Sequence, residues 1–203
     1  MNCGKKAYLI HNQEGNEWGM KKCLWSTKND WLEEYHDFEW GVPILESQQL
    51  FESFALEIFQ AGLNWEIILK KRSALREALC QFNPYELSNY TEDEVTQLLK
   101  NTEIIRNERK IRAVLHNARV VTRLSTNFSD YIWQFVDFKP IRATHHFLGD
   151  EKSRLFLMQR VVQQMQLDGF VFVGPKMLNS FFQAAGLIND HEETCFRYYE
   201  LSI

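Results

Sequence analysis

Residues 50–65, LFESFALEIFQAGLNW, form the segment around which the rest of the chain is organised. Apolar side chains recur there at intervals of three and four residues, at Phe51, Phe54, Ala55, Ile58 and Phe59. This spacing predicts a helix with one buried face, opened by Ser47. Gly62 is expected to end the helix, because glycine accepts the left-handed conformation in which helices often end.

Two features of this segment allow more than one interpretation. Leu63 and Trp65 are large apolar residues in an expected turn, and turns usually face water. Glu57 lies at the edge of the apolar stripe, where a carboxylate can face a pocket. The alternative is that Glu57 is a solvated rim residue and Trp65 fills the core, and spacing alone favours that alternative.

Length and composition are those of a globular protein. The 203 residues suit one domain, or one domain with a small second lobe, and 45% of them are apolar. The sequence has no run long enough to span a bilayer, and the apolar core of the N-terminus is too short for a signal peptide. We therefore expect a cytoplasmic protein with no membrane partner.

The distribution of charge is more informative than its total. A formal net charge of −4 argues weakly against a nucleic-acid partner. Two runs in the middle of the chain, residues 66–76 and 106–123, are nevertheless rich in lysine and arginine. They could form one positive face, and solvated helix faces explain each run equally well.

The remaining periodicity predicts an all-α fold. Residues 1–22 have no sustained period, so we expect a loosely ordered arm in front of a helical domain over residues 23–203. Residues 170–173 are the best strand candidate, but no other stretch of similar character can pair with them. Helices are expected from Asp30 to Gly41, through 70–72, from a capping box at 91–94, over 104–124, from Ser129 or Asp130 to Pro140, over 152–166 and over 176–187.

The aromatic residues of the segment 30–43 also allow two interpretations. Four aromatic rings and His36 fall within these fourteen residues. The rings could simply be core, or they could wall a flat pocket in which a ligand stacks.

Four residues near the two ends of the expected domain can supply metal ligands. His191 and Cys195 are four residues apart, which on a helix places them on one face, and Cys23 and His36 lie near the other end. Two thiolates and two imidazoles make a complete tetrahedral zinc set with no open position, so the metal would be structural. The spacing is not that of a zinc finger, and it favours two isolated buried thiols and two surface histidines.

The segment 169–176 joins two expected helices by a short turn. Backbone N–H groups at the start of the second helix are free, and with the helix dipole they can hold a phosphate. Lys176 could add charge there. A helical hairpin of this kind grips the DNA backbone without reading sequence. An ordinary helical hairpin is the alternative.

Several motifs then occur in a recognisable order. They are Cys23-x-Trp25, Tyr35-His36-Asp37-x-Glu39-Trp40-Gly41-Val42-Pro43, Leu56-Glu57-x-x-Gln60-Ala61-Gly62-Leu63-x-Trp65, Lys70-Lys71-Arg72, Ile104-Ile105-Arg106, Lys110-Ile111, Asn117-Ala118-Arg119, Gly169-Phe170-x-Phe172-Val173-Gly174 and Gln183-Ala184-x-Gly186-Leu187-x-Asn189-Asp190-His191. In this order they resemble the bacterial 3-methyladenine DNA glycosylase I family of the helix–hairpin–helix glycosylase superfamily. The similarity covers nearly the whole chain, from about Cys23 to Cys195.

The resemblance implies a DNA-repair hydrolase. Such an enzyme cleaves the N-glycosidic bond of 3-methyladenine in alkylated double-stranded DNA, releases the base, and is expected to be a monomer with one structural zinc ion. The implied zinc ligands are Cys23, His36, His191 and Cys195. The implied base-binding residues are Glu57, Tyr35, Trp65, Trp25 and Trp40, and the implied DNA contacts are Gln60, Gly62 and Leu63. The hairpin adds Val173, Gly174 and Lys176 as expected DNA contacts.

The chemistry of the substrate agrees with this implied site. A base must leave the duplex before an enzyme can reach its sugar bond, and a wedge such as Leu63 would fill the gap. Methylation at N3 makes the base cationic and a good leaving group, which an aromatic box and an ionised Glu57 both attract. Such a site needs recognition and modest electrostatic help more than a nucleophile. Glu57, the candidate catalytic residue, is therefore assigned recognition of the base first and help with water or charge second. No lysine of the pocket motifs is placed to attack the sugar.

The sequence departs from the family pattern at several positions. Asn64 stands where the family has Ser or Thr, and Pro175, Lys176 and Asn179 replace two Thr and a Tyr after the hairpin. The helix before the hairpin has lost basic residues, and His145 and His146 occupy a loop that is usually rich in Ser and Thr.

These departures support a rival hypothesis, a catalytically weak paralogue. It would keep the zinc site and the aromatic box but bind another base, a nucleoside-like ligand or a protein.

Overall fold

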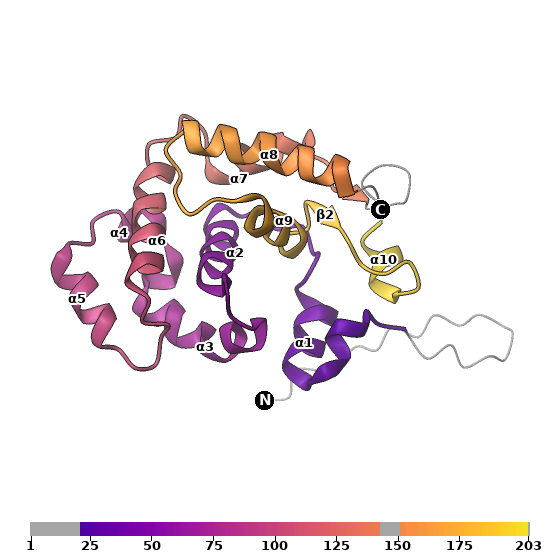
Figure 1. Ribbon diagram of the computed structural model, residues 1–203, viewed down its shortest axis with the longest axis horizontal. Coiled ribbons are helices and arrows are strands. Elements are labelled where there is room, and N and C mark those ends of the chain that lie inside the picture. Colours follow the sequence, from indigo (N-terminus) through magenta and orange to yellow (C-terminus); the bar gives the residue numbers. More distant parts are fainter. Residues whose placement is uncertain (1–20, 143–150, 203) are drawn as a thin grey trace, which may run out of the picture.

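The computed structural model describes residues 21–142 and 151–202. Figure 1 shows that these residues are mostly helical, as predicted. The helices are α1 (Asp30–Phe38), α2 (Ser47–Gln60), α3 (Trp65–Ala78), α4 (Pro84–Leu87), α5 (Glu92–Lys100), α6 (Glu108–Val121), α7 (Phe128–Trp133), α8 (Glu151–Leu167), α9 (Pro175–Ala184) and α10 (Phe196–Glu200), with short 3-10 turns η1 (Leu24–Lys28), η2 (Cys80–Phe82) and η3 (Gln134–Val136).

The strand content of the described residues is one short parallel pair. β1 (Ile141–Arg142) pairs with β2 (Ile188–Asn189), with Ile141 opposite Ile188. The predicted strand candidate, residues 170–173, is not a strand, because it forms the irregular connection between α8 and α9. No helix in residues 21–142 and 151–202 is long and apolar enough to cross a membrane.

Helix α2 lies at the centre of the fold and packs against α3, α6, α7 and α9 (Figure 1). The prediction of its buried face is confirmed, because the exposed fractions of Phe51, Phe54, Ala55, Ile58 and Phe59 are all 0%. The helix begins at Ser47 as predicted, but its cap is Glu46, whose carboxylate accepts the backbone N–H groups of residues 48 and 49.

Asparagine side chains set the start of five helices. An asparagine directly before each helix accepts a backbone N–H group of the first turn, at Asn29, Asn64, Asn83, Asn107 and Asn127. This is a preferred residue for that position, because its side-chain oxygen satisfies a donor that the helix leaves unpaired. The predicted start at Asp30 is confirmed, although the cap is Asn29, whereas the predicted starts at Ile104 and at Ser129 or Asp130 are wrong for this reason.

Other boundaries agree with the sequence pattern or refine it. The capping box between Thr91 and Glu94 is confirmed. The helix through Lys70–Arg72 is α3, which has 14 residues and is not short. The predicted helices over 152–166 and 176–187 are α8 and α9, although α9 already ends at Ala184.

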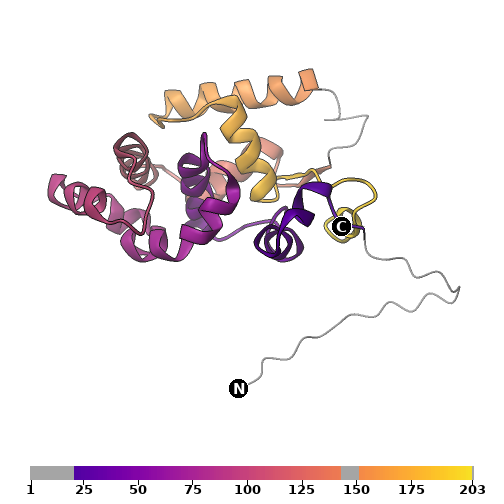
Figure 2. The same ribbon diagram turned by 60° about the horizontal axis from the view of Figure 1, so that its bottom comes forward.

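The N-terminal and C-terminal parts of the domain lie side by side (Figure 2). The backbone N–H of Phe196 donates to the carbonyl of Lys21 at 3.0 Å, and the backbone N–H of Leu24 donates to the Glu192 carboxylate at 2.8 Å. This pairing brings together ligand candidates that are far apart in the sequence. Most of the predicted arm, residues 1–20, and the predicted loop residues His145 and His146 lie outside the described residues.

Candidate active site and metal centre

A small cavity collects the predicted base-binding residues. Its volume is about 180 Å³, and it lies where α1, α2, α3 and α9 meet. This is below the roughly 300–1,000 Å³ of pockets that hold drug-sized ligands, so the cavity suits a group as small as one nucleobase. The lining residues are Trp25, Tyr35, Trp40, Glu57, Gln60, Trp65, Ser180 and Gln183.

Two aromatic pairs form most of its wall. Tyr35 of α1 and Trp65, the first residue of α3, have ring centroids 5.2 Å apart and planes tilted by 44°. Trp25 and Trp40 meet edge to face at 5.0 Å. The indole N–H of Trp65 is buried and finds no hydrogen-bond partner within the described ranges. The alternative that Trp65 is only a core residue is therefore wrong, because its ring lines a cavity.

Glu57 is buried, so the solvated-rim interpretation that spacing favoured is wrong. Its residue exposure is 4%, and no side chain or backbone group in residues 21–142 and 151–202 makes a hydrogen bond or ion pair with its carboxyl group. Burial raises its pKa to about 8, because the ionised form loses its water. Burial, followed by the nearby Glu57 charge, also raises the pKa of Tyr35. The cavity therefore presents an unpaired carboxyl group among aromatic rings.

The turn that follows α2 leads from this cavity to the surface. Gly62 is exposed and has a φ angle of +81°, which confirms its predicted role in ending the helix. The side-chain amide of Gln60 donates to the carbonyl of Leu63 at 2.8 Å. Asn64 then starts α3 by accepting the backbone N–H of Glu66. We call residues 60–63 the wedge turn.

Lys110 fastens the wedge turn from behind. Its ammonium group donates to the carbonyl of Phe59 at 2.8 Å and to that of Ala61 at 2.6 Å. These carbonyls belong to the last turn of α2 or follow it, where helices leave acceptors unpaired. Lys110 is only 6% exposed, and desolvation lowers its pKa. No role for Lys110 could be predicted from the sequence, because a lone lysine at a helix start carries no signal for such a long-range cap.

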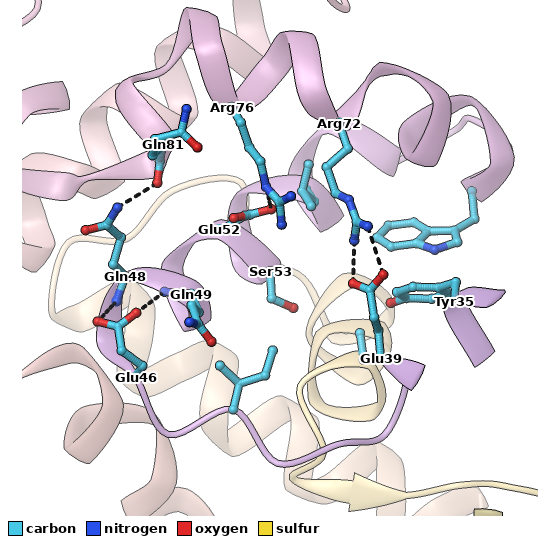
Figure 3. Close-up of a pocket in the computed structure, with 14 residues that line it drawn as sticks. Tyr35, Glu39, Glu46, Gln48, Gln49, Glu52, Ser53, Arg72, Arg76 and Gln81 are labelled. Atoms are coloured by element: carbon cyan, nitrogen blue, oxygen red, sulfur yellow. Dashed lines mark hydrogen bonds and ion pairs between the residues drawn. The ribbon is translucent and has the colours of Figure 1, made fainter. Parts of the chain in front are cut away.

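A larger polar cavity lies next to the first and shares Tyr35 and Trp65 with it. Its volume is about 490 Å³. Figure 3 shows two ion pairs across it: Arg72 makes two bonds to the Glu39 carboxylate, at 2.5 and 2.8 Å, and Arg76 binds Glu52 at 2.7 Å. Because these charges already satisfy one another, the cavity around the unpaired Glu57 is the better candidate site. The Arg72–Glu39 pair joins α3 to the end of α1.

The four predicted metal ligands come together. The ligand atoms of Cys23, His36, His191 and Cys195 lie within 4.8 Å of one another, and all four residues are buried. Individual distances are 3.2 Å between the two imidazole nitrogens and 3.3–3.7 Å from sulfur to nitrogen. A tetrahedral zinc ion with bonds of about 2.0–2.3 Å implies ligand separations of about 3.3–3.8 Å. The isolated-thiol alternative is therefore wrong, and the donor set fits zinc.

Neighbouring groups orient the two imidazoles. His36 Nδ1 lies 2.8 Å from the Asp37 carboxylate, and His191 Nε2 lies 3.1 Å from the carbonyl of Trp40. Each of these nitrogens can donate, which leaves Nε2 of His36 and Nδ1 of His191 facing the cluster as acceptors, as ligation requires. Gly41 permits this approach, since a Cβ there would lie 2.9 Å from His191 Nε2. The conditional placement of His191 and Cys195 on one helix is wrong, because both precede α10.

The cluster of candidate metal ligands, Cys23, His36, His191 and Cys195, directly adjoins the aromatic cavity. The rings of Trp40 and His191 are 4.6 Å apart, and those of Trp25 and His36 are 5.5 Å apart. Tyr35 precedes the ligand His36 in α1. Three walls of the cavity are thus adjacent in sequence to, or in ring contact with, a ligand of the cluster.

The connection between α8 and α9, residues 168–174, is a helical hairpin held by α6. We call this connection the hairpin. The Asn117 side chain donates to the carbonyl of Val171 and accepts its N–H, at 3.0 and 2.9 Å. The backbone N–H groups of Val173, Gly174 and Lys176 have no hydrogen-bond partner in the described part of the chain. The hairpin therefore presents free donors at the start of α9.

Sequence reasoning missed several contributors. Ser180 and Gln183 of α9 line the cavity, and the first had no signal while the second appeared only within a motif. Asn117 was likewise quoted without a role. Asn179 has a buried side-chain oxygen without a partner in the described ranges.

Comparison with known proteins identifies relatives over almost the whole chain. The sequence profile of a family described as methyladenine glycosylase matches residues 25–198. The DNA-3-methyladenine glycosylase of Haemophilus influenzae is 36% identical over 177 residues, which cover 86% of this chain and 96% of that protein. DNA-3-methyladenine glycosylase 1 of Escherichia coli is 36% identical over 182 residues, covering 88% and 97%.

A solved structure has the same arrangement of elements. The crystal structure of a 3-methyladenine DNA glycosylase I superimposes with a TM-score of 0.79 at 38% identity, covering 87% of this chain and 98% of the other.

Proposed function

The chain belongs to the methyladenine glycosylase family, and we propose that it hydrolyses the N-glycosidic bond of 3-methyladenine in alkylated DNA. The observation that carries the proposal is the 180 Å³ cavity in which the unpaired Glu57 meets the rings of Tyr35 and Trp65. A base-excision repair enzyme of this kind releases the damaged base as its product.

The cavity suits a planar cation. N3-methylated adenine carries positive charge while it is bonded to the sugar, and aromatic faces attract a cation. Glu57 holds a proton at neutral pH because burial raises its pKa to about 8. A cationic base beside it would lower that pKa and favour the carboxylate. The carboxylate would then hydrogen-bond the base and stabilise it until the bond to the sugar breaks.

The wedge turn would hold the duplex open. The base must leave the stack to enter the cavity, at a cost of a few kcal/mol. Gln60, Gly62 and Leu63 lie where α2 ends, next to the cavity, and we assign them to the gap that the base leaves. The turn is braced by Lys110 through the carbonyls of Phe59 and Ala61, so it can press on DNA without unwinding α2.

Lys110 also bears on the type of reaction. A lyase needs a free amine that attacks the sugar, whereas the amine of this buried lysine caps α2. We propose a monofunctional hydrolase in which the nucleophile that attacks the sugar is water and not a lysine amine.

The hairpin would hold the DNA backbone. α8, the hairpin and α9 form a helix–hairpin–helix unit, and the free N–H groups of Val173, Gly174 and Lys176 are the donors that a phosphate requires. Lys176 is exposed at the start of α9 and adds positive charge. We propose double-stranded DNA as the substrate and a monomer as the working form.

We also propose that Cys23, His36, His191 and Cys195 together bind one structural zinc ion. The support is a buried set of two sulfur and two nitrogen donors with ligand separations close to those of a zinc tetrahedron. Zinc with four protein ligands has no open position, so it would contribute stability, not chemistry. It would fasten the segment before α10 to the segment around α1.

The proposal is tested by the products released from methylated duplex DNA under single-turnover conditions. We expect prompt release of 3-methyladenine, identified by mass, while 7-methylguanine stays in the DNA. A folded, metal-loaded sample that releases no base would contradict the proposal and favour the rival, a binding module built on the same fold.

A further inference from the structure

A basic groove beside the hairpin has no role in the chemistry proposed above. It has a volume of about 970 Å³ and lies between residues 171–172 and the stretch from Arg106 to Arg119, most of which belongs to α6. Four arginines and a histidine line it, against one carboxylate, that of Glu108. These residues belong to the basic run 106–123 of the sequence, which the rest of the site leaves unexplained.

Two of the four arginines are engaged within the protein. Arg112 makes two bonds of 2.7 Å to the Glu92 carboxylate and one of 2.8 Å to Glu108. Arg119 donates to the carbonyls of Ser88 and Tyr90. Their side chains therefore hold parts of the fold together.

The other two, Arg106 and Arg109, keep an unpaired charge. Both are exposed, and neither forms an ion pair with a carboxylate in the described residues. The positive potential of the groove is therefore concentrated at the N-terminal end of α6.

Arg109 stacks on an aromatic ring of the hairpin, which favours one orientation of its side chain. Its guanidinium carbon lies 5.3 Å from the centre of the Phe172 ring, a distance at which a cation is attracted to an aromatic face. Phe172 has a φ angle of +61°, a strained conformation that a non-glycine residue adopts when its surroundings impose it. The bonds between Asn117 and Val171 fix the backbone one residue earlier. A stacked guanidinium keeps its N–H groups available at its edge.

Arg109 lies between the two proposed DNA contacts, the wedge turn and the hairpin. Lys110, next to Arg109 in α6, is bonded to the wedge turn through Ala61. Arg109 also lines a shallow depression together with Val173, Gly174 and Lys176 of the hairpin region. A strand that crosses from the wedge turn to the hairpin would therefore run over the N-terminal end of α6.

We propose that Arg106 and Arg109 bind DNA phosphates beside the extruded base, with Arg109 oriented by Phe172. This inference rests on the proposed DNA function and adds contacts that the hairpin alone does not supply. It also explains how a chain with a net charge of −4, and with Pro175 and Asn179 at the altered positions near the hairpin, can hold a polyanion.

The test measures how affinity for an undamaged DNA duplex depends on salt, for wild type and for Arg106→Gln, Arg109→Gln and the double variant. Each phosphate contact contributes about 0.9 to the slope of log affinity against log salt. We expect each single variant to bind about three- to tenfold more weakly at low salt, and the double variant to flatten the slope by about two.

Two control variants isolate the effect. Arg123→Gln removes the same charge just beyond the other end of α6 and should bind as wild type does. Arg109→Lys keeps the charge without the planar stacking and should keep most of the slope. A double variant with wild-type affinity and slope would overturn the inference.

Base release from methylated DNA, measured on the same samples, separates this inference from the proposed function. If wild type releases 3-methyladenine while the double variant binds DNA normally, the phosphate contacts are wrong and the enzyme assignment stands. If wild type releases nothing while the double variant binds DNA weakly, the contacts stand and the enzyme assignment fails.

Discussion

Glu57 is placed where an ionised carboxylate is costly for the folded protein. It is buried among aromatic rings, and its pKa lies near 8 instead of the ordinary 4.5. A pKa difference of one unit corresponds to about 1.4 kcal/mol. The position is therefore expected to lower stability at alkaline pH, in exchange for a carboxylate that can meet a cationic base.

The sign of this effect gives a prediction for Glu57→Gln. Below about pH 4.5 the carboxyl is protonated in both the folded and unfolded chains. Between pH 4.5 and 8 the unfolded chain releases a proton that the folded chain retains, so the contribution of Glu57 to stability falls as pH rises through that window. Glutamine cannot ionise. We expect the variant to unfold several degrees above wild type at pH 8.5 and the difference to shrink toward pH 5.

Thermal unfolding of the two proteins across this pH range checks the prediction. If the difference in melting temperature between wild type and Glu57→Gln stays constant from pH 5 to 8.5, burial does not raise the pKa of Glu57.

At the scale of single residues, the family resemblance predicted which side chains line the cavity, whereas helical spacing misplaced one of them. The resemblance named Glu57 and the four aromatic residues, and the cavity contains all five. Helical spacing alone put Glu57 at the rim, because periodicity defines one face of α2 but does not show that α1 and α3 close over its edge. Ser180 and Gln183 reach the same cavity from α9, which no local pattern could reveal.

At the scale of elements, the sequence predicted the buried face of an amphipathic helix well. It predicted helix boundaries less well where a capping side chain sets them. The apolar period of α2 gave its buried face, and Ser47 and Gly62 indicated its two ends. The start of α6 was placed four residues too early, since Asn107 caps the helix although the preceding Ile104 and Ile105 continue the apolar pattern.

The positions of the two proposed DNA contacts depend on side-chain bonds between elements. Lys110 lets α6 cap α2, and Asn117 lets α6 hold the hairpin, so one helix positions both proposed DNA contacts. Residues 170–173 have the aromatic and β-branched composition typical of a strand, but Asn117 occupies the hydrogen-bonding groups of Val171 that a partner strand would need. Such bonds link positions about fifty residues apart and leave no local signal in a single sequence.

At the scale of the whole molecule, the two ends of the domain meet at the four candidate metal ligands, Cys23, His36, His191 and Cys195. These ligands come from residues 23–36 and 191–195, and the rings of Trp25 and Trp40 pack against two of them. Burial raises the pKa of the Cys23 thiol to about 12, so its thiolate is favoured at neutral pH only beside a cation. Loss of the proposed zinc ion should therefore disturb both stability and the aromatic cavity.

We predict that Cys195→Ser lowers the zinc content well below one ion per chain. It should also lower the melting temperature by about 10 °C. In a protein of this size, a shift of 2–4 °C corresponds to a change of about 1 kcal/mol in the free energy of unfolding. Metal analysis and thermal unfolding check both effects. Cys80→Ser is the matched control, because Cys80 lies outside the cluster and bonds to Tyr90. Wild-type zinc content and stability in Cys195→Ser would reject the structural metal.

Which distant segments meet could be predicted only through the family resemblance. The spacing of the four ligands alone favoured isolated thiols and surface histidines, because nothing in a single sequence shows that residues 23 and 195 are neighbours. The fold brings them together through backbone bonds such as that between Phe196 and Lys21. Charge was also misleading as a total, since the basic groove lies on a chain of net charge −4.

The most direct test of the central claim compares base release by Glu57→Gln and by Glu52→Gln under single turnover. Glu52 lies on the same helix but lines the neighbouring cavity, where it pairs with Arg76. A buried hydrogen bond to a charged group is worth about 1.5–3 kcal/mol. We therefore predict that Glu57→Gln releases 3-methyladenine about 10- to 100-fold more slowly, while Glu52→Gln stays near wild type. Equal release by Glu57→Gln and wild type would contradict the assignment of this cavity as the active site.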